Sequence, residues 1–591
     1  MQKVYSSDCR ISFRVSINTK CQNNKNINIK SLVLSAENVF NKLQNAHLSI
    51  CVNSAISVRM RIIKKANKKR ENAYSIAEWF YKNRYGLALL LIVIFGIYLN
   101  LAFFYGPSWI NGSDNYIYTA QAYTLAQGHP NQLNCGIIDC VNYIVVGGIA
   151  IFFVLLGYGL FAASLFGILC YLLTILVVYL IGKQLYGQLA GILSAFFFSI
   201  FPLVISQSSN VGDDIPMILL VSLSVLLLIL ALNRPDGQKK YFLLAGFVSA
   251  INFLTISEAI IAVFFIFTYI ILILLIKKNK RLIIGLCLYV CGVILAFILI
   301  ALIGVYETGN PMFVMNVYTT NLNTLFPNQT TAFFNYLGDI FPTFTTKTLA
   351  ELSFGYFGYL FAICAIYLIA IKYKKAIIIG YWCMFSFLYL SFGTQSISNY
   401  NPVLYAGPRF MLIFVPAITI IIGITFAKII DWTKNRKPKI KFILYAMVCI
   451  IIITIFISSV ANIIYINYSQ LYSTEPLLQL GGYINNLPAN AVVYGPVDIP
   501  WSTYVNPKRQ SVALGYSSSQ TNCSGVFNTF QMPKGAFLLG NVTDYKKCSL
   551  ELIYMPYAYN WLKNYTAFVP WGPNFYEYSI YEYNPTQNSS H

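Results

Sequence analysis

Charged residues are scarce in this sequence. Asp, Glu, Lys and Arg make up 10% of its 591 residues, whereas hydrophobic residues make up 57%. Because soluble proteins carry about 25% charged residues, this composition excludes an ordinary soluble globular protein. Many apolar runs are long enough to cross the roughly 30 Å of bilayer hydrocarbon. The composition therefore predicts a polytopic α-helical membrane protein.

Histidine is also rare, and paired cysteine motifs are absent. The chain has only His47, His129 and His591, and it has no Cys-x-x-Cys sequence. With so few histidines a His-based metal site is not expected, and no metal ligands are predicted. Most of the 13 Cys lie in apolar runs or in the N-terminal segment, where they are expected to be small buried hydrophobes.

Four cysteines lie outside those regions. In an oxidising exterior they are expected to form two disulfides. The predicted pairs are Cys135–Cys140 and Cys523–Cys548.

The net charge of +21 does not indicate a nucleic-acid partner. The basic residues occur in short clusters between apolar runs, which is the pattern of cytoplasmic loops in membrane proteins.

We predict about eleven spans, at residues 86–106, 160–181, 187–206, 215–232, 241–256, 257–276, 282–303, 352–371, 376–393, 410–427 and 442–463. With the N-terminus inside, the internal inside loops carry 17 Lys and Arg, and the outside loops carry only Lys347 and Arg409.

Asn-x-Ser/Thr sequons agree with this orientation. All seven fall on the outer side, and glycosylation at any of them is a hypothesis because sequons also arise by chance. They begin at Asn111, Asn328, Asn467, Asn522, Asn541, Asn564 and Asn588.

Residues 141–157 are apolar but short, and a full span there would invert every later loop. We expect an interfacial or re-entrant helix on the outer side, with a true short span as the open alternative.

The two ends differ from the middle, which gives three predicted regions. Residues 1–80 form a basic cytoplasmic segment, of which residues 1–59 are either disordered or precede a natural start at Met60. Residues 81–463 form the transmembrane domain. Residues 464–591 are predicted to be a small extracytoplasmic α/β or α+β domain, with strands at 491–494 and 536–539 and a helix at 477–486. The protein is thus expected in the cell membrane, multi-pass.

A few charged residues lie at the outer ends of predicted spans, where charge is costly and often functional. They are Asp114, Asp213, Asp214, Glu258 and Arg409. The topology places all five at one membrane face, so they are expected to form one site there. Other roles remain open, because the three aspartates suit helix N-caps and the arginine could anchor its span by reaching toward the headgroups.

The sequence around these residues resembles a known family. Asp114 precedes a pattern of five residues in the first outer loop: Tyr118, Ala120, Ala122, Leu125 and Gly128. This pattern resembles the first-loop signature of C-type glycosyltransferases that use polyprenyl-phosphate sugars, such as protein O-mannosyltransferases and aminoarabinose transferases. The later stretches FFFSIFP, SQSSNVGDD, FLLAGFVSAINFLT and GPRFMLIFVP follow in the same order. The resemblance covers about residues 86–470.

The chain departs from the family pattern in three places. Asn115 replaces the usual Glu after the first-loop Asp, so any role of a second acid there is in doubt. No Lys or Arg occurs between Asp114 and Lys183, where some relatives have a phosphate ligand. A WWDYG-like motif is absent, which argues against the oligosaccharyltransferase catalytic subunits.

The resemblance implies inverting transfer of a hexose-type sugar from a polyprenyl-phosphate donor to a hydroxyl of a protein, lipid or glycan acceptor. It implies Asp114 as the general base and Arg409 as the phosphate partner. Asp213, Asp214 and Glu258 would bind substrate. No cofactor is required, although a divalent cation is compatible with these acids. A lipid or glycan transporter and a non-catalytic envelope-assembly scaffold are the alternatives.

Overall fold

The structure is a computed structural model. It describes residues 83–102, 113–129, 141–233, 238–318, 333–341, 353–393 and 408–487, and five strands between residues 493 and 583. The chain divides into two compact units, Met1–Arg84 and Tyr85–His591. The second unit contains both a helix bundle and a β-sheet.

Eight helices in the described residues are long and apolar enough to cross a membrane, and a bent helix pair raises this number to nine. The multi-pass prediction is therefore confirmed. The eight are Asn83–Ala102, α5 (Leu160–Leu185), α8 (Asp214–Asn233), α10 (Ile260–Lys277), α11 (Lys280–Thr308), α16 (Ile377–Phe392), α17 (Val415–Lys434) and the first part of α18 (Pro438–Asn486).

The predicted spans at 241–256 and 352–371 are shorter than expected. They correspond to α9 (Gln238–Ile251) and α15 (Phe357–Ala370), which have 14 residues each. The α-helix of α9 gives way to the 3-10 turn η4 (Asn252–Leu254), and the Thr255 hydroxyl donates to the Asn252 carbonyl at 2.6 Å. The stretch at 141–157 is α4 (Tyr143–Leu156), also 14 residues long.

The bent pair consists of α6 (Gln188–Ser199) and α7 (Pro202–Ser208), which meet at 64°. Pro202 explains the break, because proline has no N–H to continue the hydrogen-bond ladder and its ring clashes with the preceding turn. α7 leads from this bend toward the acidic pair at 213–214.

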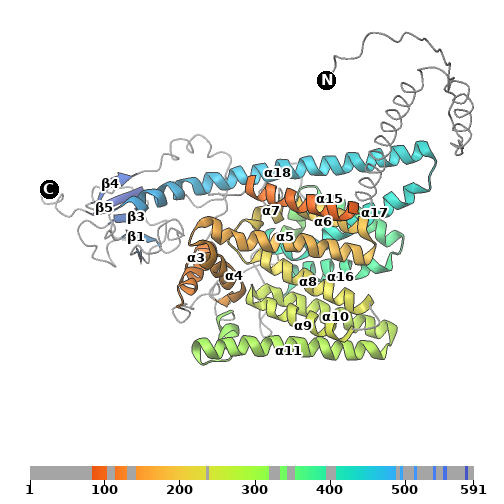
Figure 1. Cartoon of the computed structure of the whole chain (residues 1–591), viewed down its shortest axis with the longest axis horizontal. Coiled ribbons are helices and arrows are strands. Elements are labelled where there is room, and N and C mark those ends of the chain that lie inside the picture. Colours follow the sequence, from red (N-terminus) through yellow and green to blue (C-terminus); the bar gives the residue numbers. More distant parts are fainter. Residues whose placement is uncertain are drawn as a thin grey trace, which may run out of the picture. The chain divides into compact units, whose positions relative to one another are not determined.

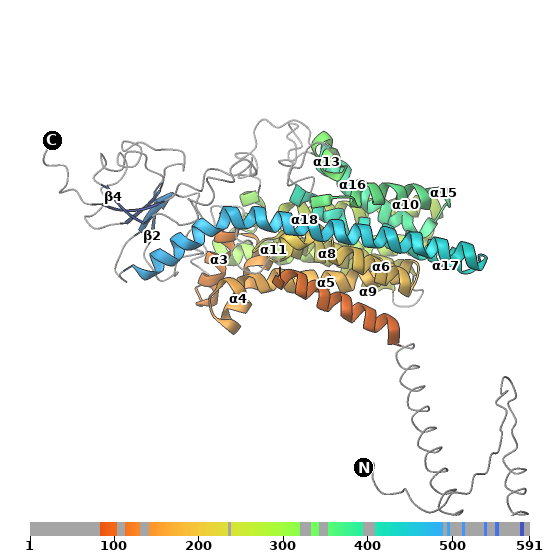
Figure 2. The same cartoon turned by 90° about the horizontal axis from the view of Figure 1, so that it is seen from above.

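The bundle is built from neighbouring helices in close contact. α5, α8, α9 and α11 lie side by side in that order (Figure 1). α10 packs against α16 (Figure 2), and α15 packs against α17. Glycines permit the closest approach: a Cβ on Gly246 of α9 would collide with the Tyr289 carbonyl, and one on Gly292 of α11 with the Leu243 carbonyl.

Apolar side chains are distributed as a bilayer requires. The interior is filled by large side chains such as Trp382, Tyr171 and Phe197, which are fully buried. Large apolar side chains such as Leu302 of α11 and Ile450 of α18 face outward instead. Because no water surrounds these outer faces in a membrane, their exposure is expected for helices in contact with lipid.

The C-terminal region contains a five-stranded sheet of order β2-β1-β3-β5-β4. Its strands are β1 (Val493–Pro496), β2 (Ser511–Leu514), β3 (Phe537–Gly540), β4 (Leu550–Tyr554) and β5 (Ser579–Tyr583). β1 pairs in parallel with β2 and β3, whereas β5 pairs antiparallel with β3 and β4. β1 and β3 overlap the strands predicted at 491–494 and 536–539.

The predicted helix at 477–486 is part of α18, which has 49 residues and continues through the predicted domain boundary at 463/464. Asn467 lies on this helix. The other six sequon asparagines lie outside the described residues, as do the four cysteines of the predicted disulfides.

Candidate functional site

Asp213 is the best-defined acidic group of the predicted site. It directly precedes α8, and its carbonyl accepts the Met217 N–H at 3.0 Å, so it occupies the N-cap position. The residue is only 5% exposed, and its Oδ2 accepts from the Tyr118 hydroxyl at 2.8 Å and from the Asn142 amide at 3.3 Å. The side chain is therefore oriented by groups from other elements, beyond any cap role.

Asn142 is the centre of this polar network. Its amide also donates to the Tyr118 hydroxyl at 2.7 Å, and its carbonyl oxygen accepts from the Tyr318 hydroxyl. Tyr318 also donates to the Phe253 carbonyl at 3.2 Å. The network thus joins α3 (Ser113–Ala126), the start of α4, the start of α8, η4 and the helical segment at 313–318. Such a connected network holds the Asp213 carboxylate in one position.

Glu258 is a second buried acid at the same end of the bundle. It lies in the 3-10 turn η5 (Ser257–Ala259) and is 9% exposed. Its carboxylate lies within electrostatic range of Asp213 and of Arg409. Within the described part of the chain, Glu258 Oε2 has no hydrogen-bond partner. A buried carboxylate oxygen without a donor is costly, so this atom is available to a ligand's hydroxyl or amine.

Two tyrosines lie near Glu258. Its charge acts on Tyr336 of α13 (Phe333–Ile340) and on Tyr389 of α16. Burial, and then the charges of Glu258 and Asp339, raise the pKa of the Tyr336 hydroxyl above its ordinary value. That hydroxyl is fully buried and has no hydrogen-bond partner among the described residues. It stays protonated at neutral pH and can donate a hydrogen bond to a ligand.

Arg409 provides a positive charge at this site. It is half-buried in the 3-10 segment η7 (Pro408–Phe414), and its guanidinium lies 5.0 Å from the Phe410 ring centroid. η7 packs against α8 and α16, and the Arg409 charge acts on Glu258. The attraction offsets part of the repulsion between the two buried acids. Asp214, 4% exposed in the first turn of α8, adds another carboxylate.

Asp114 can be located through its backbone, which belongs to a helix. α3 begins at Ser113, so Asp114 lies in its first turn, while its side chain lies outside the described residues. Residues four apart on a helix share a face, and the residue four positions on is Tyr118, which donates to Asp213. The helix therefore positions Asp114 one turn from the Asp213 network.

The structure brings Asp213, Glu258 and Arg409 to one end of the bundle, and it adds residues that the sequence did not single out. Asn142, Tyr318 and Tyr336 carry no recognisable motif, because their partners are distant in sequence. Only the position of Asn142, at the polar start of an apolar stretch, could have drawn attention to it. In the ranges that the structure describes, no group of three or more His, Cys, Asp or Glu is arranged to hold a metal ion.

The sequence matches one family model. Residues 144–305, which include α4 through most of α11, match the family described as dolichyl-phosphate-mannose-protein mannosyltransferase. No curated protein matches the chain. The family match confirms the predicted resemblance and, with it, the prediction of a glycosyltransferase enzyme.

Solved structures resemble the fold at low sequence identity. Cupriavidus metallidurans ArnT bound to undecaprenyl phosphate is 11% identical, with a TM-score of 0.56 over 84% of this chain and 98% of that one. Its apo form is 10% identical, with a TM-score of 0.55 over the same shares. The Archaeoglobus fulgidus oligosaccharyltransferase is 14% identical, with a TM-score of 0.48 over 74% of this chain and 65% of that one. The ArnT matches show a shared membrane fold.

Proposed function

We propose that this protein is a membrane glycosyltransferase that moves a hexose-type sugar from a polyprenyl-phosphate donor to a hydroxyl acceptor. The observation that carries the proposal is a group of buried acids at one end of an apolar bundle, in which the charges of Asp213 and Arg409 act on Glu258. A lipid-linked sugar needs such a place, because its tail must stay in the bilayer while its phosphate and sugar reach polar groups. The match to the mannosyltransferase family supports this choice of reaction.

The proposed reaction is a single displacement at the anomeric carbon. The acceptor oxygen attacks C1 of the sugar, and a carboxylate takes the acceptor proton as the new C–O bond forms. The bond between C1 and the phosphate oxygen breaks, and polyprenyl phosphate leaves with the bonding electrons. Attack opposite to the leaving group inverts the configuration. We assign the proton to Asp114, which lies on the helix that also supplies Tyr118 to the network.

Arg409 is assigned to the departing phosphate. A guanidinium can form two parallel hydrogen bonds to phosphate oxygens and stabilise the charge that develops as C1–O breaks. Because the Arg409 charge acts on Glu258, the phosphate and the sugar would lie next to each other in the proposed complex. Glu258 Oε2 and the Tyr336 hydroxyl, which have no hydrogen-bond partners among the described residues, would bind sugar hydroxyls. Asp213 and Asp214 would orient the donor.

The proposed topology has eleven crossings and places this site on the outer face. Asp213 precedes α8 and Glu258 precedes α10, and the charge of Asp213 acts on Glu258. Because α8 crosses away from this end of the bundle, α9 must cross back to it before α10 begins. The charge of Glu258 also acts on Tyr336, which precedes α15, and on Tyr389, which lies late in α16. Because both tyrosines are at the end of the bundle that contains Glu258, α15 must cross away from that end and α16 must cross back. α4 would lie along the outer interface, and the region at 464–591 would lie outside the membrane.

A donor panel tests the proposal. Purified protein in nanodiscs is incubated with polyprenyl-phosphate sugars that differ in the sugar, and release of polyprenyl phosphate is measured with and without acceptors. We expect at least one donor to be consumed with transfer to a hydroxyl. If every donor remains intact while the protein moves a labelled lipid or glycan across the bilayer, the transporter interpretation replaces this one. If neither occurs, the scaffold interpretation does.

A further inference from the structure

A second polar feature lies at the opposite end of the bundle. Glu258 is at the start of α10 and Lys277 is its last residue; the 18 residues of this helix separate the two by about 27 Å. Around Lys277 the structure contains a cavity of about 320 Å³. It is therefore distinct from the site of the acids.

Four cations from three segments line this cavity. Lys277 ends α10, Arg281 lies in the first turn of α11, and Lys374 and Lys375 belong to the 3-10 turn η6 (Lys374–Ala376). Among the described residues, the cavity wall contains no Asp or Glu. The adjoining stretch at 234–237 contains one Arg and one Asp, so it adds no net charge. Four positive charges thus converge on one cavity without a matching anion on its wall.

Apart from Asn233 and Asn279, the other wall residues are apolar or aromatic. Phe242, Tyr269 and Ile378 belong to this wall and are buried. Beside the cations, Leu275 and Ile276 are exposed, at 68% and 71%. In a bilayer these exposed side chains contact acyl chains. The basic wall is therefore adjacent to lipid, at the membrane depth where α10 ends.

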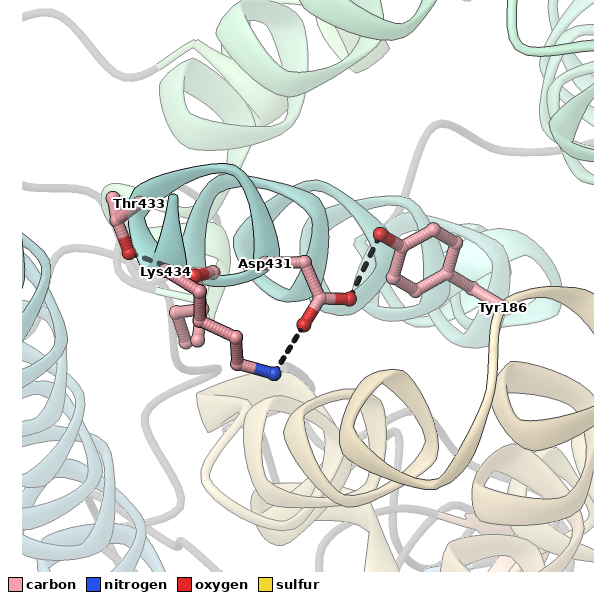
Figure 3. Close-up of polar contacts among 5 residues, drawn as sticks. Tyr186, Asp431, Thr433 and Lys434 are labelled. Carbon is pink, nitrogen blue, oxygen red and sulfur yellow. Dashed lines mark hydrogen bonds and ion pairs between the residues drawn. The ribbon is translucent and has the colours of Figure 1, made fainter. Parts of the chain in front are cut away.

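The neighbouring helices brace the cavity edge. The Tyr373 hydroxyl, directly before η6, donates to the carbonyl of Leu185, a wall residue, at 2.6 Å. The Lys428 ammonium lies 4.3 Å from the Tyr373 ring centroid and 5.1 Å from that of Tyr186. Figure 3 shows the continuation of this contact, in which Asp431 accepts from Tyr186 at 2.9 Å and pairs with Lys434 at 2.6 Å. The position of η6 is thus fixed relative to α5 and α17.

We propose that this cavity binds the phosphate headgroup of an anionic membrane phospholipid. The four cations would contact the phosphate, and the acyl chains would run along the exposed apolar side chains of α10. A basic cavity between membrane helices matches the chemistry of such headgroups. A free phosphate ion offers the same charge, but it would leave the adjacent apolar surface without a role.

Native mass spectrometry of the full-length protein tests this proposal. The protein is titrated with phosphatidylglycerol, with phosphatidylcholine or with inorganic phosphate, and bound molecules are counted. We expect retained phosphatidylglycerol and little phosphatidylcholine. The variant Lys277→Ala/Arg281→Ala/Lys374→Ala/Lys375→Ala should bind phosphatidylglycerol at least about tenfold more weakly. The readout does not involve sugar transfer, so it is independent of the proposed function.

A matched control removes the same charge elsewhere at this end of the bundle. Lys239→Ala/Arg436→Ala/Lys437→Ala/Lys439→Ala should keep wild-type affinity, because none of the four lines the cavity. If both variants lose binding equally, a diffuse basic surface explains the affinity and the proposal is wrong. If inorganic phosphate binds while phosphatidylglycerol does not, the lipid occupant is wrong. Should the quadruple variant not fold, Lys374→Ala/Lys375→Ala is compared with Lys374→Arg/Lys375→Arg, and equal affinity of these two also overturns the proposal.

Discussion

At the scale of single residues, the two buried acids Asp213 and Glu258 differ in their hydrogen bonds. Asp213 has two side-chain donors from other elements, while Glu258 has an oxygen without a donor among the described residues. Hydrogen bonds to a carboxylate stabilise its charged form, so Asp213 is suited to remain an anion of fixed position. Glu258 is suited to gain a partner when substrate arrives. The two acids should therefore respond differently to substitution.

Asp213→Asn should reduce transfer without preventing folding. Removing the charge loses an interaction worth about 1.5–3 kcal/mol, which corresponds to roughly 10- to 150-fold in kcat/KM. Tyr118→Phe, which removes one donor to Asp213, should cost less. The measurement is kcat and KM for the donor, with Glu307→Gln, an acid substitution elsewhere in the bundle, as the control. Equal activity of Asp213→Asn and the control would show that Asp213 only caps α8.

Arg409→Ala should weaken use of the donor by about 10- to 100-fold, since a charge-assisted contact to phosphate is lost. Arg409→Lys should recover only part of the activity, because an ammonium lacks the planar fork of the guanidinium. The measurement is the donor concentration dependence of transfer. If the alanine variant has wild-type kinetics, another group must bind the phosphate.

At the scale of elements, the helices are held together by close backbone contacts. Gly246 and Gly292 bring α9 and α11 together, and Gly423 of α17 contacts Ser194 of α6. In a membrane, such contacts are a major source of stability, because lipid gives apolar side chains little reason to associate. These glycines are therefore sensitive positions far from the proposed chemistry.

Gly246→Ala should lower stability by about 1–3 kcal/mol, because its Cβ would collide with the backbone carbonyl of Tyr289. Gly380→Ala is the matched control, since a Cβ at that position of α16 would meet no other part of the protein within 4 Å beyond its own stretch of helix backbone. The measurement is the midpoint of thermal unfolding in detergent. Equal midpoints for the two variants would contradict the close packing of α9 and α11.

Some elements could be predicted from the sequence, and others could not. Hydropathy located the long spans because each depends only on its own residues, but it could not determine that α9 and α15 are short. The charge pattern predicted that Asp213, Glu258 and Arg409 share one end of the bundle. The roles of Asn142 and Tyr318 could not be predicted, since their hydrogen bond joins residues 176 positions apart.

At the scale of the whole molecule, the proposal requires the two polar features to lie on opposite sides of the membrane. The acids would face outward, and the basic cavity would face the cytoplasm, in agreement with the clustering of Lys and Arg. α11 connects the two sides, from Arg281 at the cavity to its end near the segment that contains Tyr318.

Accessibility of single cysteines tests this topology. In a background without native cysteines, Asn310→Cys should react with a membrane-impermeant maleimide on intact cells, because it is exposed just after α11. Lys278→Cys, exposed at the other end of the bundle, should react only after the cells are opened. Labelling of both in intact cells would contradict the proposed orientation.

The central claim is that acids at the outer end of the bundle transfer sugar from a polyprenyl phosphate. The most direct test is release of polyprenyl phosphate from a labelled donor by wild type and by Asp114→Asn. Asparagine suits the start of a helix, so it preserves the structural role while removing the proton acceptor. We expect a donor-dependent rate in wild type that falls about 10²–10⁴-fold in the variant, because a general base contributes that much. A well-folded Asp114→Asn protein that releases polyprenyl phosphate at the wild-type rate would contradict it.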